Sequence, residues 1–179
     1  MLVFILVQAG VGPFGRGGNQ PGPDQPPAVD QKRYQELRAV VEKNPQSYAA
    51  LFELGQMTFE SDRFEESITW LERALQVKPD DVWSMLDVGT ANFNLGDREK
   101  AREIWLKALE IDPTNPQTHW NLSFYYASKQ PAEIETAMGH WQQVLQYAKP
   151  GDQLAQLAQT HIDQYKSRVS STPTAVPQR

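Results

Sequence analysis

Hydrophobic residues recur along the middle of the chain at helical spacing, in segments separated by short polar turns. Intervals of three and four residues place apolar side chains on one face of a helix. Two segments show the pattern most clearly, one with Phe64, Ile68, Leu71 and Leu75, the other with Ala101, Ile104, Trp105, Ala108 and Leu109. Each follows another segment of helical length. The pattern predicts an all-α protein built from helical hairpins.

The hairpins repeat at a fixed period. Pro45, Pro79 and Pro113 stand 34 residues apart. The same step relates three further sets of positions, namely Gly55, Gly89 and Ser123, then Leu54, Val88 and Leu122, then Leu51, Met85 and His119. A period of this length is typical of stacked helical repeats, in which each unit covers the apolar face of its neighbour.

Residue types at the ends of the helices predict where the chain turns. Proline disfavours helix in the residue before it, so the second helices end ahead of Pro79 and Pro113. Asp62, with Glu65 three residues later, has the form of a helix N-cap. Leu95-Gly96-Asp97 predicts a helix stop, a left-handed turn and a new cap. Gly55 and Gly89 are expected to allow close approach of a second helix, with Ala74 and Ala108 opposite them.

The windows Tyr48–Asp81 and Val82–Asn115 resemble the tetratricopeptide-repeat (TPR) family. Both carry its pattern of a small residue five positions before the repeat-ending proline, Ala74 before Pro79 and Ala108 before Pro113, and the first carries Leu51-x2-Leu54-Gly55. The resemblance implies a TPR α-solenoid of antiparallel helix pairs, with about three repeats. We place them at residues 48–81, 82–115 and 116–151 of a domain spanning 30–169.

The third window departs from the pattern. Ala137, Trp141 and Val144 lie 36 rather than 34 residues after their counterparts. We place the additional residues at Ser128–Pro131, with Pro131 opening the next helix. Capping helices are expected at 30–43, with Tyr34, Leu37, Val40 and Val41 on one face, and at 152–167, with Leu154, Leu157, Ile162 and Tyr165. A disordered tail is expected at 170–179.

The N-terminus differs in composition from the repeats. Residues 1–14 are nearly all apolar, but the unbroken run Met1–Val7 is shorter than the roughly 20 residues that span a bilayer. Residues 15–29, rich in Pro, Gly and Gln, form a linker. The apolar segment is interpreted as the tail of a membrane anchor that begins upstream, as a signal peptide, or as a disordered tail. We expect a membrane-associated protein, with a cytoplasmic or secreted soluble protein as the alternative.

In TPR arrays the first helices line a concave groove, and the resemblance carries this role to matching positions here. Trp83 and Phe93 are the strongest candidates for contact with a partner peptide or helix, because buried aromatic side chains dominate binding energy. Alternatively, Phe52 and Trp120 pack between repeats. The full set of groove candidates is Phe52, Gln56, Phe59, Trp83, Leu86, Thr90, Phe93, Trp120 and Phe124.

These features predict a protein–protein interaction adaptor. Capture of a terminal carboxylate requires Lys, Arg and Asn on the first helices. The corresponding positions hold Phe52, Gln56, Leu86, Asp87, Trp120 and Asn121, so a chaperone-tail receptor is disfavoured. One alternative to an adaptor is a structural subunit of a larger membrane complex, bound through the convex side.

A narrower resemblance concerns the C-terminal part. The run His140-Trp141-x2-Val144-Leu145-x4-Pro150-Gly151-Asp152 is similar to the membrane-tethered TPR subunit of bacterial cytochrome c maturation. That family implies a role as an assembly chaperone for apocytochrome c, which we keep as an alternative function.

Composition excludes several other classes. A net charge of -5 and no basic cluster argue against nucleic acid as a partner. No phosphate-binding loop or nucleophile motif is present, cysteine is absent, and we expect neither an enzyme nor a cofactor. His119, His140 and His161 are spaced by 21 residues, which does not form a helical metal pair. His119 is expected to be partly buried, and His140 and His161 to lie at the surface.

Overall fold

The computed structural model describes residues 29–171, with side chains to Ser167. It divides the chain into two compact units, which we call unit 1 (Met1–Pro113) and unit 2 (Thr114–Arg179). The helices of unit 1 are α1 (Gln31–Lys43), α2 (Tyr48–Glu60), α3 (Phe64–Val77), α4 (Val82–Asn94) and α5 (Arg98–Ile111). Those of unit 2 are α6 (Pro116–Ala127), α7 (Ile134–Tyr147) and α8 (Gln153–Ser171).

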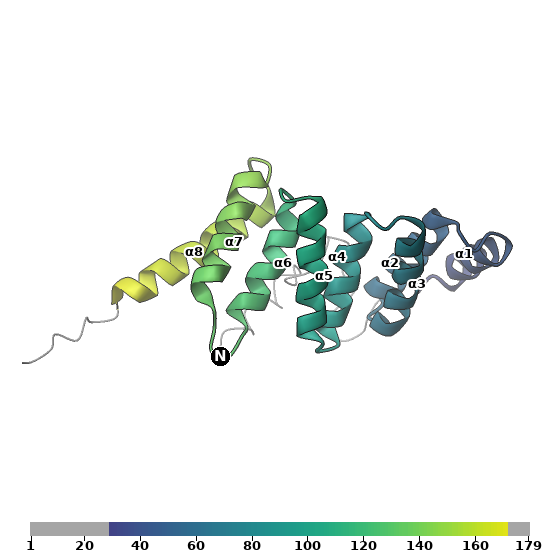
Figure 1. Ribbon diagram of the computed structural model, residues 1–179, viewed down its shortest axis with the longest axis horizontal. Helices are drawn as coiled ribbons and strands as arrows, with labels where there is room; N and C mark the ends of the chain where they lie inside the picture. Colours follow the sequence, from purple (N-terminus) through teal and green to yellow (C-terminus); the bar gives the residue numbers. More distant parts are fainter. Residues whose placement is uncertain (1–28, 172–179) are drawn as a thin grey trace, which may run out of the picture. The chain divides into compact units, whose positions relative to one another are not determined.

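In unit 1, neighbouring helices in the sequence pack against one another. α1 contacts α2, and contacts then run from α2 to α3, from α3 to α4 and from α4 to α5. α2 also contacts α4, which brings together the first helices of two successive hairpins. Figure 1 shows the alternating direction of these helices. The predicted all-helical class and the antiparallel pairing are confirmed.

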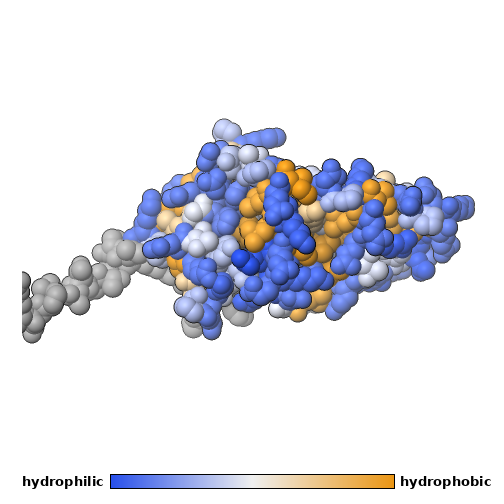
Figure 2. Space-filling model, viewed as in Figure 1, coloured by the Kyte–Doolittle hydropathy of each residue, from blue (hydrophilic) through white to orange (hydrophobic). Residues whose placement is uncertain are grey.

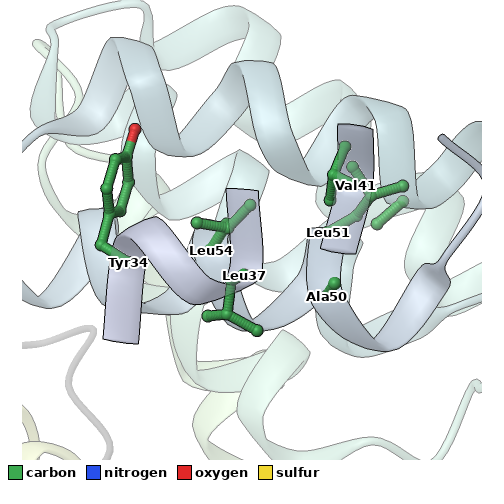
Figure 3. Close-up of a cluster of buried hydrophobic side chains, with 7 residues drawn as sticks. Tyr34, Leu37, Val41, Ala50, Leu51 and Leu54 are labelled. Carbon is green, nitrogen blue, oxygen red and sulfur yellow. The ribbon is translucent and has the colours of Figure 1, made fainter. Parts of the chain in front are cut away.

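The core of unit 1 begins where α1 covers α2. Figure 3 shows the buried side chains of Tyr34, Leu37 and Val41 from α1 facing Ala50, Leu51 and Leu54 from α2. Burying each large aliphatic side chain stabilises the fold by about 1.5–3 kcal/mol. Residues 30–43 thus form the expected N-terminal cap. Val40, predicted to share the apolar face of α1, is instead 44% exposed.

The two repeat glycines lie against large side chains rather than small ones. A Cβ atom at Gly55 would lie 2.4 Å from Cγ of Leu71, and one at Gly89 would lie 2.3 Å from Nε1 of Trp105. The prediction that glycine allows close helix packing is confirmed. The prediction that Ala74 and Ala108 lie opposite the glycines is wrong, because Leu71 fills the space next to Gly55 and Trp105 fills the space next to Gly89.

One predicted turn is confirmed and another is not. Gly96 has a φ of 90°, and the Asp97 side chain accepts a hydrogen bond from the backbone N–H of Lys100. Asp62, predicted as an N-cap, instead lies in the turn itself with a φ of 56°. The N-cap of α3 is Arg63, whose side chain makes no capping hydrogen bond. The prediction placed the cap one residue early.

Unit 2 consists of a helical hairpin and a closing helix. α6 packs against α7, α7 against α8, and α6 also contacts α8. Ala158 and Ile162 of α8 are buried, so the expected C-terminal cap is present, although α8 continues to Ser171 rather than ending at Ser167. Pro131 lies in the longer turn before α7, which begins at Ile134, so its predicted place at the start of the helix is wrong.

Residues 1–28 and 172–179 lie outside the described part, together with the predicted apolar segment and nearly all of the predicted linker and tail. Within residues 29–171, no helix combines the length and the apolar character needed to cross a membrane.

Candidate functional site

The candidate residues of α2 are half-buried, and their rings pack against other residues of the same repeat. The Phe52 ring stacks on the Tyr48 ring, with centroids 5.7 Å apart and planes 14° from parallel. Phe59 meets Phe64 of α3 edge to face at 5.5 Å. Gln56 is half-buried on the same helix. These rings therefore stabilise the repeat and also present part of their surface.

Tyr48 belongs to this region, although sequence reasoning gave it only as the start of a repeat. The Lys78 ammonium nitrogen lies 3.8 Å from the centroid of the Tyr48 ring, a cation–π contact. Burial of the hydroxyl, followed by the nearby Asp81 and Asp87 carboxylates, raises the pKa of Tyr48 to about 12. Asp81 also caps α4, because its carboxylate accepts a hydrogen bond of 2.7 Å from the Ser84 N–H.

On α4 the candidates separate into exposed and buried positions. Trp83 is 45% exposed, the highest value among the large hydrophobic residues that the structure describes in unit 1. Leu86 and Thr90 are only 2% and 3% exposed, and the Thr90 hydroxyl donates a hydrogen bond to the Leu86 carbonyl oxygen. These two side chains form part of the interior and offer a partner almost no surface.

Phe93 takes an intermediate position. Its ring lies 5.8 Å from that of the buried Trp105, and the Arg98 guanidinium lies 5.3 Å from its centroid. The side chain therefore supports the α4–α5 hairpin. Of the two strongest candidates from the sequence, Trp83 is the one with large exposed area.

The charges on the first helices of unit 1 are all negative. α2 and α4 contain the carboxylates of Glu53, Glu60 and Asp87 and no Lys or Arg. Glu53 accepts two hydrogen bonds from the Arg33 guanidinium of α1, at 2.6 and 2.7 Å, and this pairing lowers the pKa of Glu53. The face formed by these two helices is therefore aromatic and weakly acidic.

In unit 2 the candidate rings are covered by the closing helix. Trp120 is 1% exposed and meets the half-buried Phe124 edge to face at 4.9 Å. The His161 ring of α8 lies 5.8 Å from Trp120 and 5.6 Å from Phe124. Trp120 is a packing residue here, which is the alternative that the sequence left open for it.

The histidines are more buried than expected. Nδ1 of His119, which is 7% exposed, lies 3.0 Å from Nδ1 of His140, and the His140 ring stacks on Tyr126 at 5.5 Å. Burial, and then the electrostatic interaction with His119, lower the pKa of His140 to about 4. The prediction of a surface position for His140 is wrong. His140 on α7 pairs with His119 on α6, and residue spacing along a single helix does not indicate a contact between two helices.

His161 is likewise not a surface residue. Its ring stacks on Trp141 with centroids 5.0 Å apart and planes 7° from parallel, and burial lowers its pKa. The three histidines thus belong to the packing of unit 2. Among the residues that the structure describes, no group of three or more carboxylate or imidazole side chains is arranged to hold a metal ion.

The second helices of unit 1 also carry exposed apolar side chains. Val77, at the end of α3, is 36% exposed, and Ile111, at the end of α5, is 44% exposed. Figure 2 shows apolar residues, in orange, set among hydrophilic ones on the face in view. Trp83 therefore has counterparts of similar exposure elsewhere in the unit, which serve as controls for its role.

Models of the tetratricopeptide repeat match residues 34–82 and 84–115. The chain is 33% identical over 82 residues to the protein CTR9 homolog of Arabidopsis thaliana. It is 32% identical over 71 residues to the peroxisomal targeting signal receptor of Candida albicans. The alignments cover 45% and 38% of this chain but only 8% and 12% of the relatives, so the chain spans a small part of the length of either relative.

Solved structures share the fold. A crystal structure of MamA has a TM-score of 0.61 at 17% identity, covering 76% of this chain and 81% of that one. The first TPR domain of Spaghetti (RPAP3), bound to an HSP90 peptide, has a TM-score of 0.60 at 16% identity, covering 70% of this chain and 95% of that one.

The narrower of the two resemblances drawn from the sequence receives no support from these relatives. None of the proteins named above is described as a subunit of cytochrome c maturation, so that resemblance remains a prediction. The broader one is supported by both repeat models, by the aligned relatives and by the helical hairpins of unit 1. Residues 34–82 and 84–115 are tetratricopeptide repeats, and this part of the chain belongs to the tetratricopeptide-repeat family.

Proposed function

We propose that this protein is an interaction adaptor that binds a peptide or helix of a partner protein along α2 and α4. The observation that carries the proposal is the position of Trp83, a large aromatic side chain that is 45% exposed at the start of a first helix. Exposed tryptophan is enriched among residues that dominate binding energy at interfaces. The half-buried rings of Phe52, Phe59 and Phe93 extend the aromatic character along the two helices.

A structural relative supports this mode of binding. The first TPR domain of Spaghetti (RPAP3) has a similar fold and was solved with a bound HSP90 peptide, SRMEEVD. A fold of this type therefore accommodates a peptide. We do not expect this chain to bind an acidic peptide of that kind, because its helices α2 and α4 contain no Lys or Arg to bind carboxylates.

The test compares two exposed apolar residues of unit 1 on different helices. Trp83→Ala removes the candidate contact on α4, and Ile111→Ala removes a side chain of similar exposure on α5. Partners that co-purify with the full chain are quantified, and far-UV circular dichroism verifies the helical content. Loss of partners with Trp83→Ala alone supports the proposal, and retention of every partner in that variant contradicts it.

A second candidate function is that of a structural subunit bound through its second helices. The exposed Val77 and Ile111 favour this candidate, since both offer apolar contact area on the second helices α3 and α5. The same pair of variants separates the two functions. Loss of partners with Ile111→Ala, and not with Trp83→Ala, supports the structural role.

The proposal extends to a membrane tether. It rests on the sequence of residues 1–14, whose apolar side chains precede a Pro/Gly/Gln-rich linker. Flotation of the full chain with lipid vesicles tests it, with Phe4→Asp as the variant that places a charge in the apolar run. Equal flotation of the two proteins, or none by either, contradicts the tether.

A further inference from the structure

We infer that α6 and α7 form a second binding surface in unit 2, which α8 covers and which a helix of a partner protein occupies when α8 is displaced. The inference goes beyond the proposed function, because it concerns unit 2 and not the face of α2 and α4. The partner helix that it specifies is amphipathic, with a small residue and a branched aliphatic residue four positions apart and a planar ring directly before the latter.

α8 is attached to unit 2 on one side only. Among the described helices it packs against α6 and α7 and no other. Of its side chains up to Ser167, only those of Ala158 and Ile162 are buried, whereas the shorter α6 buries eight residues. Segments that bury little apolar area open locally at a lower free energy than the core does. α8 therefore leaves this surface more readily than α6 and α7 separate from each other.

The surface beneath α8 is aromatic. The His161 ring stacks on Trp141 of α7 with centroids 5.0 Å apart, and it lies 5.8 Å from Trp120 and 5.6 Å from Phe124 of α6. Three rings from two helices thus surround one side chain of α8. Together with the buried contacts at positions 158 and 162, the ring completes the i, i+3, i+4 spacing by which a helix is bound in an apolar groove.

The fit of α8 to this surface is incomplete. In the described part of the chain, no acceptor lies within hydrogen-bonding distance of the buried Nε1 of Trp141. In the second repeat the equivalent Nε1, on Trp105, donates to the Leu86 carbonyl oxygen. The matching carbonyl in unit 2, that of Trp120, accepts a hydrogen bond of 2.6 Å from the Ser123 hydroxyl instead. Because a buried donor without an acceptor destabilises a structure, a helix that supplies an oxygen here binds more favourably than α8.

The charges around the surface favour uncharged anchors. α6 contains no Asp, Glu, Lys or Arg, and α7 contains only Glu135, in its first turn. The opposite side of α8 is polar, with Gln159 donating a hydrogen bond of 2.8 Å to the Asp163 carboxylate. An amphipathic helix therefore docks through apolar contacts and keeps its polar side in water, and its affinity should change little with salt.

The test uses the full chain and a capped, fluorescently labelled peptide with the sequence of residues 152–171. Ala158→Asp in the chain places a charge at a buried contact of α8 and leaves α6 and α7 unaltered. Since the chain's own α8 competes at a high effective concentration, we expect the peptide to bind this variant at least about tenfold more tightly than the wild type. Gln164→Asp adds the same charge at an exposed position of α8 and should behave as the wild type does. Fluorescence anisotropy measures the affinities, and far-UV circular dichroism verifies the helical content.

Two further peptides connect binding with the contact residues. Ile162→Asp in the peptide should abolish binding to the Ala158→Asp chain, because it places a charge in the apolar contact. The other peptide keeps only Ala158, His161 and Ile162 on an otherwise unrelated, soluble helical sequence. Its affinity should lie within about threefold of that of the first peptide, since a few anchor residues carry most of the binding energy.

Hydrogen exchange of the wild-type chain tests the displacement of α8 without any substitution. The backbone amides of α8 should exchange at least about tenfold faster than those of α6 and α7. This measurement keeps the inference testable if Ala158→Asp does not fold. Equal exchange rates in the three helices would show that α8 does not leave alone, which contradicts the inference.

The binding outcomes also separate the possible occupants. If the first peptide binds neither protein, or binds the wild type and Ala158→Asp equally, the second surface is wrong. Light scattering that shows dimers of the wild type, absent from Ala158→Asp, assigns the surface to α8 of a second copy and contradicts a partner protein. Trp83→Ala should leave every peptide affinity unchanged, so failure of this inference does not affect the proposed function of α2 and α4.

Discussion

The Trp105 indole packs directly against the Gly89 backbone, so closely that a Cβ atom on the glycine would lie 2.3 Å from Nε1 of the tryptophan. The same Nε1 donates a hydrogen bond of 3.4 Å to the Leu86 carbonyl oxygen, one turn before Gly89 on α4. A helix with a side chain at position 89 could not accept the indole in this orientation. The contact therefore fixes how closely α5 approaches α4.

Gly89→Ala should consequently destabilise the protein by about 1–3 kcal/mol, the usual cost of overpacking a well-filled interior. Urea denaturation monitored by circular dichroism measures the change. The matched control is Gly139→Ala on α7, where an added Cβ meets nothing within 4 Å. Alanine should stabilise that helix by about 0.5–1 kcal/mol. Equal effects of the two substitutions would show that the indole does not constrain position 89.

The sequence was informative about the helices because their signals are local. Period, apolar spacing and prolines located every helix of unit 1 within a few residues, and the 34-residue step brought equivalent positions into register. The step also explains one error. Asp62 and Gly96 are equivalent positions, and both have positive φ. Glycine at position 96 indicated the left-handed conformation by its residue type. Aspartate at position 62 is also a common N-cap residue, so the sequence predicted a cap there instead.

The candidate site was harder to predict, because exposure depends on contacts between helices. Leu86 and Thr90 occupy first-helix positions that the TPR resemblance assigns to the groove, yet both are buried. The pairing of His119 with His140 joins α6 to α7, and no spacing along either helix indicates it. Trp83 was identified because it is aromatic and occupies a first-helix position that the TPR resemblance assigns to the groove.

The equivalence of Asp62 and Gly96 gives a second prediction. Asp62 has a φ of 56°, which a non-glycine residue adopts only at a cost, so Asp62→Gly should leave stability unchanged or raise it by a few tenths of a kcal/mol. Gly96→Ala, at a φ of 90°, should cost about 1 kcal/mol. Thermal and urea denaturation of both variants compares them. A greater loss at position 62 than at 96 would contradict this account.

The two tryptophans of the second repeat should differ sharply in their contribution to stability. Trp105 is fully buried, and Trp105→Ala should cost about 3–5 kcal/mol through lost contacts and a cavity. Trp83 is 45% exposed, and Trp83→Ala should cost less than about 1 kcal/mol. Urea denaturation of the two variants measures both values. A loss at Trp83 as large as at Trp105 would make it a core residue and remove the basis for its proposed role in binding.

The half-buried histidines His140 and His161 of unit 2 make the stability of the protein depend on pH. An exposed histidine in the unfolded chain has a pKa near 6.5, and in the folded protein burial lowers the pKa of His140 to about 4. Between these two values the unfolded state binds a proton that the folded state does not. The stability contributed by neutral His140 is therefore fully present above about pH 6.5 and is lost as pH falls towards 4, by about 2 kcal/mol at pH 5.

His161 gives the cleanest test of this linkage, because phenylalanine supplies a similar aromatic ring that cannot bind a proton. In His161→Phe the aromatic stack on Trp141 is retained, and the group whose pKa burial lowers is removed. The variant should match the wild type near pH 7 and become progressively more stable than the wild type as pH falls below about 6.5, since its unfolded chain binds one proton fewer. Carboxylates such as Glu53 titrate in both proteins, so the difference between their urea-denaturation curves across pH 4.5–7 isolates the histidine. If the difference in stability between the two proteins stays constant over this range, His161 has the same pKa in the folded and unfolded states, and its contacts with α6 and α7 do not shield it from water.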